Sequence, residues 1–261
     1  MLAFKIATWN VNSVRTRADH IRAFLADAAP DVLALQELKA EAGQVPVDAF
    51  AEAGYGATVF GQKTYNGVAF LHRDGLEPAE VRRGFPDDGD DAPARLIAAR
   101  FGGLQLINIY LPNGSEVGSD KYAYKLDWMA RLRTWLDAEF DPAEPVVLVG
   151  DFNVAPEDRD VHDPEALRGR ILFSDAEKEA LERIRAWGFT DCFRAHHAEA
   201  GLYSWWDYRM NQFRRDMGLR IDHVWATPAA AEACAACDIV VEPRRWERPS
   251  DHAPVVAEFE L

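Results

Sequence analysis

Short apolar segments that end in polar side chains recur along this chain from end to end. The polar endings are carboxylates, carboxamides, imidazoles and one phenol, at Asn10, Gln36, Glu37, Asn108, Tyr110, Asp151, Asn153, Asp222, His223, Asp251 and His252. A strand of this kind buries its apolar residues and presents its end at the edge of a sheet, which is a rigid mount for a functional site. The pattern therefore predicts a sheet-based fold with a polar site at one edge.

Strand-like and helix-like periodicities alternate between these endings. Strands are predicted over residues 4–9, 32–35, 104–110, 145–149, 219–225 and 255–259. One helix is predicted where Ile21, Phe24, Leu25 and Ala28 follow helical spacing up to Pro30, and a longer one over residues 121–139. The residues of the longer helix that are predicted to face the core are Leu126, Met129, Ala130, Leu132, Trp135 and Leu136.

A further helix is predicted from a capping box, in which Ser174 stands three residues before Glu177. Leu181 and Ile184 would face inward, and Gly188 would end the helix. The polar segments 86–91 and 158–165 are interpreted as surface loops. No repeat, low-complexity tract or linker divides the chain, so the sequence predicts a single α/β domain over residues 1–261.

Composition limits what such a domain can do. With 261 residues, 48% of them hydrophobic, the chain can form one large core. Its 29 Lys and Arg against 43 Asp and Glu give a formal net charge of −14. That charge excludes a protein that binds nucleic acid through bulk positive charge. A local basic strip remains compatible with it, because screening confines phosphate attraction to about 8 Å.

Three cysteines cannot all pair within the chain, so a disulfide scaffold is excluded and a reducing compartment is favoured. Cys234 and Cys237 form a Cys-x-x-Cys without the second pair that zinc would need, and Cys192 is distant in the sequence. We interpret all three as ordinary buried or surface thiols. The start of the chain lacks a signal-peptide pattern, and no run of about 18 apolar residues indicates a membrane span. A soluble cytoplasmic protein is expected.

The most strand-like run, residues 145–149, leads directly into Asp151 and Asn153. In an extended chain these two side chains project from the same face, while Phe152 points into the core. The alternative is a turn in which Asp151 caps the following segment. Glu37 ends a buried strand and needs either a metal ion or an arginine beside it, because an unpaired buried carboxylate is costly.

The endings together are rich in oxygen donors and include few imidazoles. Such a set suits Mg²⁺ or Mn²⁺, whereas zinc sites usually combine clustered Cys and His. Asp251 and His252 could instead form a hydrogen bond that fastens the last strand. His223 shares a strand face with Ile221 and Trp225, opposite Asp222, so it is predicted to lie in the core or to support the site from behind.

The ordered motifs resemble those of the bacterial exonuclease III family of AP endonucleases. They are W-N-V-N-S-V-R at 9–15, L-Q-E at 35–37, N-G-V-A at 66–69, N-I-Y-L-P-N-G at 108–114, G-D-F-N-V-A-P at 150–156, Y-S-W-W-D-Y-R at 203–209, R-I-D-H at 220–223 and S-D-H at 250–252. Each motif is weak alone, but the ordered set spans nearly the whole chain. The resemblance implies the endonuclease/exonuclease/phosphatase fold, a four-layered α/β sandwich of two packed, mostly antiparallel β-sheets flanked by helices.

The resemblance also implies a Mg²⁺-dependent DNA phosphodiesterase of base excision repair. Such an enzyme incises duplex DNA 5′ to abasic sites and acts on blocked 3′ ends as a 3′-to-5′ exonuclease and 3′-phosphatase. With Glu37 as the leading ligand, the residues implied around the metal are Asn10, Glu37, Asp151, Asn153, Asp251 and His252.

Roles in the reaction follow from the same resemblance. Asp151 would orient or deprotonate the attacking water, and Asn153 would hold that group or the transition state. Asp222 would fix His252 against the scissile phosphate, and either Asp151 or His252 would be the base. Tyr110 would contact the phosphate or assist the leaving oxygen, with Asn113 binding phosphate beside it. Either one metal ion or two would serve.

DNA contacts are implied for aromatic and basic residues near R-I-D-H. Trp206 matches the aromatic residue of the family's pocket, and Phe213 lies in the loop expected to approach the duplex. One of Trp205 and Trp206 is expected to be an ordinary core residue. The densest basic stretch near the site consists of Arg209, Arg214, Arg215 and Arg220. Some of these arginines could instead pair with Asp207 and Asp216.

Three positions depart from the usual family pattern. Leu38 stands where threonine is common, which affects hydrogen bonding around Glu37. Phe213 stands where tryptophan is frequent, which bears on strand insertion and on the balance of exonuclease to endonuclease activity. Asn66 replaces a frequent serine, and no consequence is expected.

Two other classes of protein compete with this interpretation. Sphingomyelinases, inositol phosphatases and secreted nucleases of the same fold share the glutamate and the Asp-His ending, but S-W-W-D-Y and R-I-D-H point away from them. A non-catalytic DNA-binding relative would have lost Glu37, Asp151 or His252, and all three are present. Within the family, a mainly 3′-to-5′ exonuclease is the alternative. The expected partner is double-stranded DNA with abasic sites or blocked 3′ ends, bound by a monomer without membrane contact and acting at the nucleoid.

Overall fold

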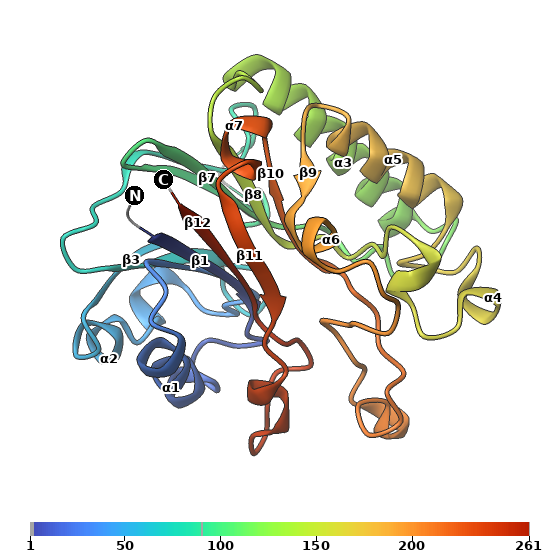
Figure 1. Cartoon of the computed structure of the whole chain (residues 1–261), viewed down its shortest axis with the longest axis horizontal. Helices are drawn as coiled ribbons and strands as arrows, with labels where there is room; N and C mark the ends of the chain where they lie inside the picture. The colour runs from blue at the N-terminus through green and yellow to red at the C-terminus, as the bar shows by residue number, and fades with distance from the viewer. Residues whose placement is uncertain (1–2, 90, 261) are drawn as a thin grey trace.

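The chain folds into four layers, with two β-sheets packed face to face and helices on the outer side of each (Figure 1). The computed structural model describes residues 3–89 and 91–260. Within these residues each sheet has six strands, and each contains one parallel pair among otherwise antiparallel neighbours. The predicted four-layered, mostly antiparallel sandwich is therefore confirmed.

The first sheet has the strand order β11-β12-β1-β2-β4-β3. Its strands are β1 (Ala3–Asn10), β2 (Val32–Gln36), β3 (Tyr55–Phe60), β4 (Val68–Arg73), β11 (Cys234–Ile239) and β12 (Val255–Glu260). β1 lies between its parallel partner β2 and its antiparallel partner β12. On the outer side lie α1 (Ala18–Ala28) and α2 (Val47–Ala51), with the 3₁₀ turn η1 (Ala42–Gln44) between β2 and α2.

The second sheet has the order β5-β6-β7-β8-β10-β9. Its strands are β5 (Ala79–Arg83), β6 (Leu96–Phe101), β7 (Leu104–Tyr110), β8 (Val146–Asp151), β9 (Thr190–Asp191) and β10 (Asp222–Ala226). The long helices α3 (Asp120–Glu139) and α5 (Asp175–Arg185) cover its outer face. The short elements are α4 (Pro164–Leu167), α6 (Cys192–His196), α7 (Pro228–Ala231), η2 (Asp158–Asp160), η3 (Arg209–Asn211) and η4 (Glu242–Arg245).

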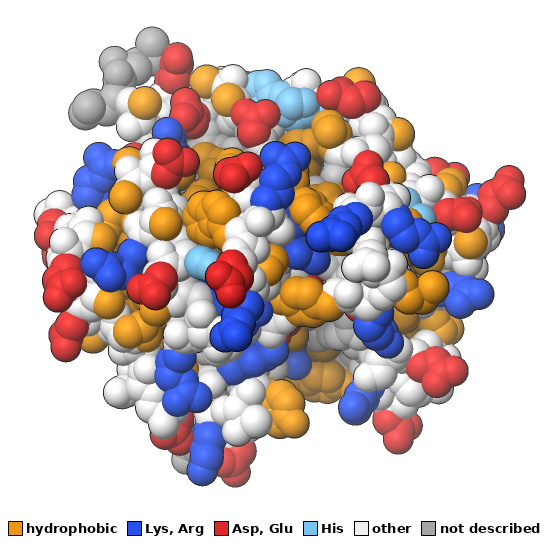
Figure 2. All heavy atoms as spheres, turned by 90° about the horizontal axis from the view of Figure 1, so that it is seen from below, with side chains coloured by type: hydrophobic (Ala, Val, Ile, Leu, Met, Phe, Trp, Pro, Cys, Tyr) orange, Lys and Arg blue, Asp and Glu red, His pale blue; other side chains and the backbone are white. Residues whose placement is uncertain are grey.

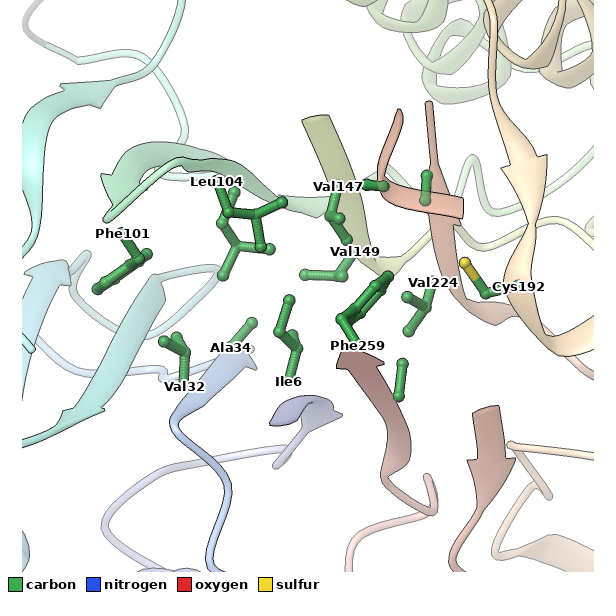
Figure 3. Packing of buried hydrophobic residues seen from close by; sticks show 14 of the residues in the cluster. Ile6, Val32, Ala34, Phe101, Leu104, Val147, Val149, Cys192, Val224 and Phe259 are labelled. Atoms are coloured by element: carbon green, nitrogen blue, oxygen red, sulfur yellow. The ribbon is translucent and has the colours of Figure 1, made fainter. Parts of the chain in front are cut away.

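Apolar side chains from the inner faces fill the space between the sheets (Figure 3). The labelled members include Ile6, Val32 and Ala34 from the first sheet and Val147, Val149 and Val224 from the second, all of them buried. Burial of each such aliphatic side chain contributes about 1.5–3 kcal/mol. Two further clusters attach the helices to the outer faces, so each sheet is packed on both sides. In the described part of the chain, no helix is both long enough and apolar enough to cross a membrane.

Most of the predicted helix faces are confirmed. Ile21, Phe24 and Leu25 are buried in α1, and α5 begins with the predicted capping box. In α3 the prediction for Ala130 is wrong, because that residue is exposed. The buried stripe of α3 includes Lys125 instead, which lies opposite a buried glutamate of α5.

The predicted loops and one predicted strand need correction. Segment 158–165 is not wholly a surface loop, because Asp160 at the end of η2 is fully buried against two arginines. The strand predicted over residues 219–225 begins only at Asp222, and Leu219 makes isolated bridges to Val161 and Trp205. Residues 86–89 lie in a loop as predicted, and Asp90 of the same segment lies outside the described residues.

Candidate active site and metal centre

Strand ends from both sheets meet along one edge of the sandwich. In the first sheet β1 ends at Asn10 and β2 leads into Glu37, while in the second β7 ends at Tyr110 and β8 at Asp151. The register pairs Asp151 with Tyr110 on one side and with Asp222 on the other. The segments that follow β11 and precede β10 project together at the bottom of Figure 1. The polar endings therefore lie together, as their pattern predicted.

Glu37, Asp151 and His252 each offer a ligand atom, and these atoms all lie within 4.8 Å of one another. Asn10 connects two of them, because its Nδ2 donates to Glu37 Oε1 and to Asp151 Oδ2, both at 2.9 Å. Two carboxylates so close together repel each other unless positive charge lies nearby. Hard oxygen donors with one imidazole suit a divalent cation such as Mg²⁺ or Mn²⁺, which Glu37 and Asp151 would hold.

Lys39 supplies positive charge at this site and was not anticipated from the sequence. Its Nζ lies 2.8 Å from Glu37 Oε2 and donates to Asn12 Oδ1 at 2.5 Å. The partner of Glu37 is thus a lysine rather than the arginine considered above. Glu37 and Lys39 both have positive φ, 52° and 51°, and such backbone costs of order 1–3 kcal/mol per residue. The lysine two residues after the glutamate in L-Q-E-L-K was the available signal.

His252 and Asp222 form a buried pair at the junction of the sheets. The Nδ1 atom of His252 lies 3.0 and 2.9 Å from the two carboxylate oxygens of Asp222, and Ser204 Oγ donates to the same carboxylate at 2.6 Å. Nε2 of the imidazole faces Asp151 Oδ2 at 3.7 Å. Burial alone would lower the pKa of His252, but the charges of Asp222 and Asp151 outweigh it and raise the pKa well above its usual value. This pairing therefore favours the protonated form of His252.

Asp151 both caps a turn, which is the alternative that the sequence allowed, and faces the site. Its Oδ1 accepts the backbone N–H of Asn153 at 2.9 Å, which caps the turn after β8, and its Oδ2 faces Asn10 and His252. Burial raises the pKa of Asp151; the charge of His252 opposes this effect, and that of Asp222 adds to it. The expectation of an extended chain through Asn153 is wrong, because that residue has a left-handed φ of 48°.

Asn153 consequently points toward the loop after β7 instead of into the cluster. Its Nδ2 donates to Leu111 O, and its Oδ1 accepts from Asn113 Nδ2, both at 3.0 Å. Tyr110 OH donates to Glu37 Oε1 at 3.0 Å. Burial raises the pKa of Tyr110 well above its usual value, so the phenol stays protonated at neutral pH. Tyr110 and Asn113 thus lie at the site as predicted. Tyr110 is hydrogen-bonded to Glu37, and Asn113 is hydrogen-bonded to Asn153.

A buried lysine supports this turn from below. Lys125 of α3 is fully buried, and its Nζ donates to Asn153 O at 2.7 Å and to Asn113 O at 3.1 Å. It also pairs with Glu177 Oε1 at 2.5 Å, and Glu177 in turn caps the start of α5. Burial lowers the pKa of Lys125, against the opposing charge of Glu177. Hydrophobic periodicity could not reveal this residue, because it interrupts the apolar stripe.

Asp251 lies beside the cluster of Glu37, Asp151 and His252 rather than within it. Asn12 Nδ2 donates to Asp251 Oδ1 at 2.9 Å, and Trp205 Nε1 donates to Asp251 Oδ2 at 3.0 Å. Its carboxylate therefore orients two neighbouring side chains. Metal ligation by Asn10, Asn153 and Asp251 stays a prediction.

The two adjacent tryptophans have different surroundings. Trp206 is 3% exposed and packs edge-on against Phe213, with ring centroids 5.1 Å apart. Trp205 is only half-buried, and its ring centroid lies 6.4 Å from that of His252. One of the two is thus a core residue, as expected. Trp205 is the aromatic beside His252, whereas Trp206 packs beneath Phe213 and with it lines a cavity of about 470 Å³. A DNA-binding role for Trp206 stays a prediction.

The four arginines predicted to contact DNA divide into two groups. Arg220 is fully buried, with its Nε 2.7 Å from Asp160 and its NH2 nitrogen 2.8 Å from Asp191, so that prediction is wrong for this conformation. Its guanidinium also lies 2.9 Å from Nδ1 of the core residue His223. Arg209, Arg214 and Arg215 are exposed, and Arg209 pairs with Asp207 as the alternative foresaw. Figure 2 shows the face from which these loops project, where Lys and Arg side chains alternate with hydrophobic ones.

A cleft of about 640 Å³ opens beside Glu37 and Tyr110. Lys39, Arg95 and Lys121 line it as well. The guanidinium of Arg95 lies 4.7 Å from the ring centroid of Tyr110 and donates to Tyr110 O at 3.1 Å. This basic lining offers the local phosphate attraction that the net charge lacks. The arginine and Lys121 stand outside the motifs, so sequence patterns gave no signal for either.

Comparison with known proteins agrees with this geometry. The chain matches the Endonuclease/Exonuclease/phosphatase family over residues 7–252. Exodeoxyribonuclease III of Haemophilus influenzae is 36% identical, over 98% of this chain and 99% of that protein. The 3′ phosphatase NExo from Neisseria, solved with a product DNA hairpin, has a TM-score of 0.94 and 42% identity, over 99% of this chain and 100% of that one. An AP endonuclease from Archaeoglobus fulgidus has a TM-score of 0.94 and 38% identity with the same coverage. The chain therefore belongs to the Endonuclease/Exonuclease/phosphatase family.

Proposed function

We propose that this protein is a Mg²⁺-dependent, monomeric DNA repair enzyme that incises duplex DNA 5′ to abasic sites and also processes blocked 3′ ends. As a family member it is a divalent-metal-dependent nuclease of DNA repair. The observation that carries the finer proposal is the convergence of Glu37, Asp151 and His252 from two sheets beside a basic cleft. A phosphate group, a water molecule and a cation could all bind next to these three side chains.

Phosphodiester hydrolysis needs an activated water, neutralisation of the charge that builds on the phosphate, and help for the leaving oxygen. A divalent cation held by Glu37 and Asp151 would supply charge neutralisation. The charges of Asp222 and Asp151 favour the protonated form of His252, which would donate a hydrogen bond to the phosphate. Asp151 would then orient or deprotonate the attacking water. Tyr110 keeps its proton and assists the leaving oxygen.

Selectivity for a missing base requires a recess that admits a bare sugar beside the phosphate. Trp205 bridges to Leu219 and packs against the cluster that contains Ile221, next to His252. The half-buried ring of Trp205 is the apolar surface that would border such a recess. Extrusion of an abasic nucleotide costs a few kcal/mol less than extrusion of a stacked base, so the recess favours the damaged site.

The proposal is tested with a duplex oligonucleotide that carries one tetrahydrofuran abasic analogue. Wild-type protein is compared with Glu37→Ala and Asp151→Asn, and Asp19→Asn serves as the matched control because its side chain is 95% exposed on α1. We expect incision 5′ to the analogue with Mg²⁺, loss of incision in EDTA and in both site variants, and no change in the control. Absence of cleavage by wild-type protein on every DNA substrate would refute the proposal.

A mainly exonucleolytic enzyme is the second candidate, because the Neisseria neighbour at 42% identity is described as a 3′ phosphatase and as a 3′-5′ exonuclease. The discriminating substrates are an intact duplex and a duplex with a 3′-phosphate, run beside the abasic duplex. Removal of 3′ phosphate or terminal nucleotides without internal incision would assign this activity and exclude the abasic endonuclease. Incision at rates well above end digestion would exclude the second candidate.

A further inference from the structure

The three cysteines meet in the fold although Cys192 is distant in the sequence. Cys192 begins α6, next to the second sheet, whereas Cys234 and Cys237 lie on β11 of the first sheet. All three are free thiols. Cys192 and Cys237 are buried in the core between the sheets, and Cys234 packs against that core. Figure 3 shows Cys192 at the margin of this cluster, next to Val224. The thiols therefore lie where the two sheets face each other.

Two of the thiols lie where α6 packs on the start of β11. Cys192 belongs to the core cluster against which Cys234 packs, and it stands one helical turn before His196 on α6. His196 Nε2 lies 3.2 Å from Cys234 O, which holds α6 against the start of β11. Cys234 is half-buried, while Cys192 is 1% exposed. Cys234 is thus partly accessible to small solutes, whereas Cys192 is not.

The surroundings favour the thiolate at Cys234 and the thiol at Cys192. The hydrogen bond from Cys192 lowers the pKa of Cys234; burial opposes this effect, and His196 reinforces it. Burial raises the pKa of Cys237, which faces the core. Thiolates, not thiols, react with peroxides, so reactivity is confined to one of the three. The Cys-x-x-Cys spacing is incidental, and the functional partner comes from α6, which follows β9 of the second sheet.

A metal does not explain this cluster. Among the described residues, the group of His, Cys, Asp and Glu ligand atoms that lie close enough to hold an ion is Glu37, Asp151 and His252, without any cysteine. We propose that Cys234 is a peroxide-reactive thiol and Cys192 its resolving partner, so that hydrogen peroxide converts the pair into a reversible disulfide between β11 of the first sheet and α6, which follows β9 of the second sheet.

The chemistry balances in two steps. The Cys234 thiolate attacks one oxygen of hydrogen peroxide and the O–O bond breaks. The products are a sulfenic acid at Cys234 and a hydroxide ion, which is the leaving group. The sulfur of Cys192 then displaces the hydroxyl group of that sulfenic acid, and the released hydroxide takes the thiol proton as water. Two thiols lose two electrons, and one hydrogen peroxide is reduced to two waters. A dithiol reductant reverses the change.

The position of the pair predicts what the bond does. β11 pairs Cys234 with Phe259 at the end of β12 that is remote from His252, whereas Ile239 pairs with Val255 near it. A disulfide here joins the sheets without reaching the candidate active site. We expect the oxidised protein to cleave DNA within about twofold of the reduced rate and to melt at a higher temperature, because the bond constrains the unfolded chain.

The test uses the full chain, reduced, freed of reductant and exposed to hydrogen peroxide. Peptide mapping after alkylation should find a Cys192–Cys234 disulfide and an alkylated Cys237. In Cys192→Ala, dimedone should trap sulfenic acid at Cys234, and in Cys237→Ala, the matched control, the disulfide should still form. Mapping of the wild-type protein needs no variant to fold. Three alkylated thiols after peroxide, or a Cys234–Cys237 bond, would overturn the proposal, and an unchanged melting temperature would overturn the link between the sheets.

Discussion

At the scale of single residues, the site depends on where its protons reside. Asp222 is the largest source of the charge that keeps His252 protonated, and it is itself held by Ser204. The proposed partition of roles, with Asp151 acting on the water and His252 donating to the phosphate, depends on this one pair. A change at Asp222 therefore alters chemistry at a phosphate that Asp222 does not touch.

Asp222→Asn should narrow the pH range of activity. The active imidazolium exists below the pKa of His252 and is lost as pH rises through it. Because this substitution removes the charge that raises the pKa of His252, the alkaline decline of kcat/KM should move to lower pH, and kcat at neutral pH should fall about 10²-fold or more. Profiles from pH 6.5 to 9.5 with saturating Mg²⁺ measure this, with Asp19→Asn as control. An alkaline limb that stays in place would contradict the assigned role.

Trp205 and Trp206 should differ sharply when each is changed to alanine. Trp206→Ala empties a core position and should cost about 3–5 kcal/mol of unfolding free energy. Trp205→Ala should leave stability nearly unchanged and raise KM for the abasic duplex several-fold, because it removes the wall of the recess. Urea unfolding and steady-state kinetics measure the two effects. A larger kinetic defect in a well-folded Trp206→Ala would reverse the assignment.

At the scale of elements, α3 and α5 contribute to the site through one buried ion pair. Lys125 and Glu177 are both fully buried, and Lys125 holds the carbonyls of Asn113 and Asn153. Besides covering the outer face of the second sheet, the two helices therefore support the candidate site. They fix the loop after β7 and the turn after β8 relative to each other.

Removal of Lys125 should therefore affect both stability and rate. Lys125→Met leaves the Glu177 charge buried and unpaired, which should cost about 3–5 kcal/mol. Lys125→Met with Glu177→Gln removes that charge and should recover part of the stability, while kcat stays low in both variants because the two carbonyls have lost their donor. Urea unfolding and single-turnover cleavage give the two readouts. Recovery of kcat together with stability would show that the lysine serves folding alone.

Arg220 joins η2, β9 and β10 through Asp160 and Asp191. Burial would raise the pKa of both carboxyls, but Arg220 outweighs it and holds each pKa below the usual 3.8. Groups with a lowered pKa stabilise the folded state above their unfolded value and lose that effect as pH falls. The stability difference between wild type and Arg220→Met, about 3–5 kcal/mol near neutrality, should shrink between pH 5 and pH 3. A difference in urea midpoints that is constant with pH would contradict this.

At the scale of the whole molecule, a chain of net charge −14 must bind a polyanion through a local surface. Each arginine that contacts phosphate contributes about 0.9 to the slope of log K against log salt. Arg209→Ala, Arg214→Ala and Arg215→Ala combined should reduce the slope, and Arg22→Ala on α1 should not. Fluorescence anisotropy with the Asp151→Asn protein in EDTA, across salt concentrations, measures it. An unchanged slope would move the DNA contacts to the cleft lined by Lys39, Arg95 and Lys121.

The sequence predicts features that depend on neighbouring residues, but not contacts between residues that are distant in the chain. The strands, the capping box at Ser174 and the polar strand ends depend on neighbouring residues, so their periodicity reveals them. Lys39 and Lys125 gain their roles from partners brought close only by folding. Arg220 lies in a basic stretch that is typical of a surface contact with DNA. It is nevertheless buried, because it pairs with the carboxylate of Asp160, which stands 60 residues earlier in the chain. Buried charges are invisible to hydrophobic periodicity because their partners compensate for them elsewhere in the chain.

The place of β12 in the first sheet has a consequence for how the protein is made. β12 pairs with β1 in the interior of that sheet, and Trp9 donates to the carbonyl of His252 across 243 residues of sequence. A ribosome delivers Glu37 and Asp151 long before His252. Until β12 emerges, β1 has an open edge and the cluster lacks its imidazolium. The nascent chain therefore lacks the complete cluster of Glu37, Asp151 and His252 until β12 pairs with β1.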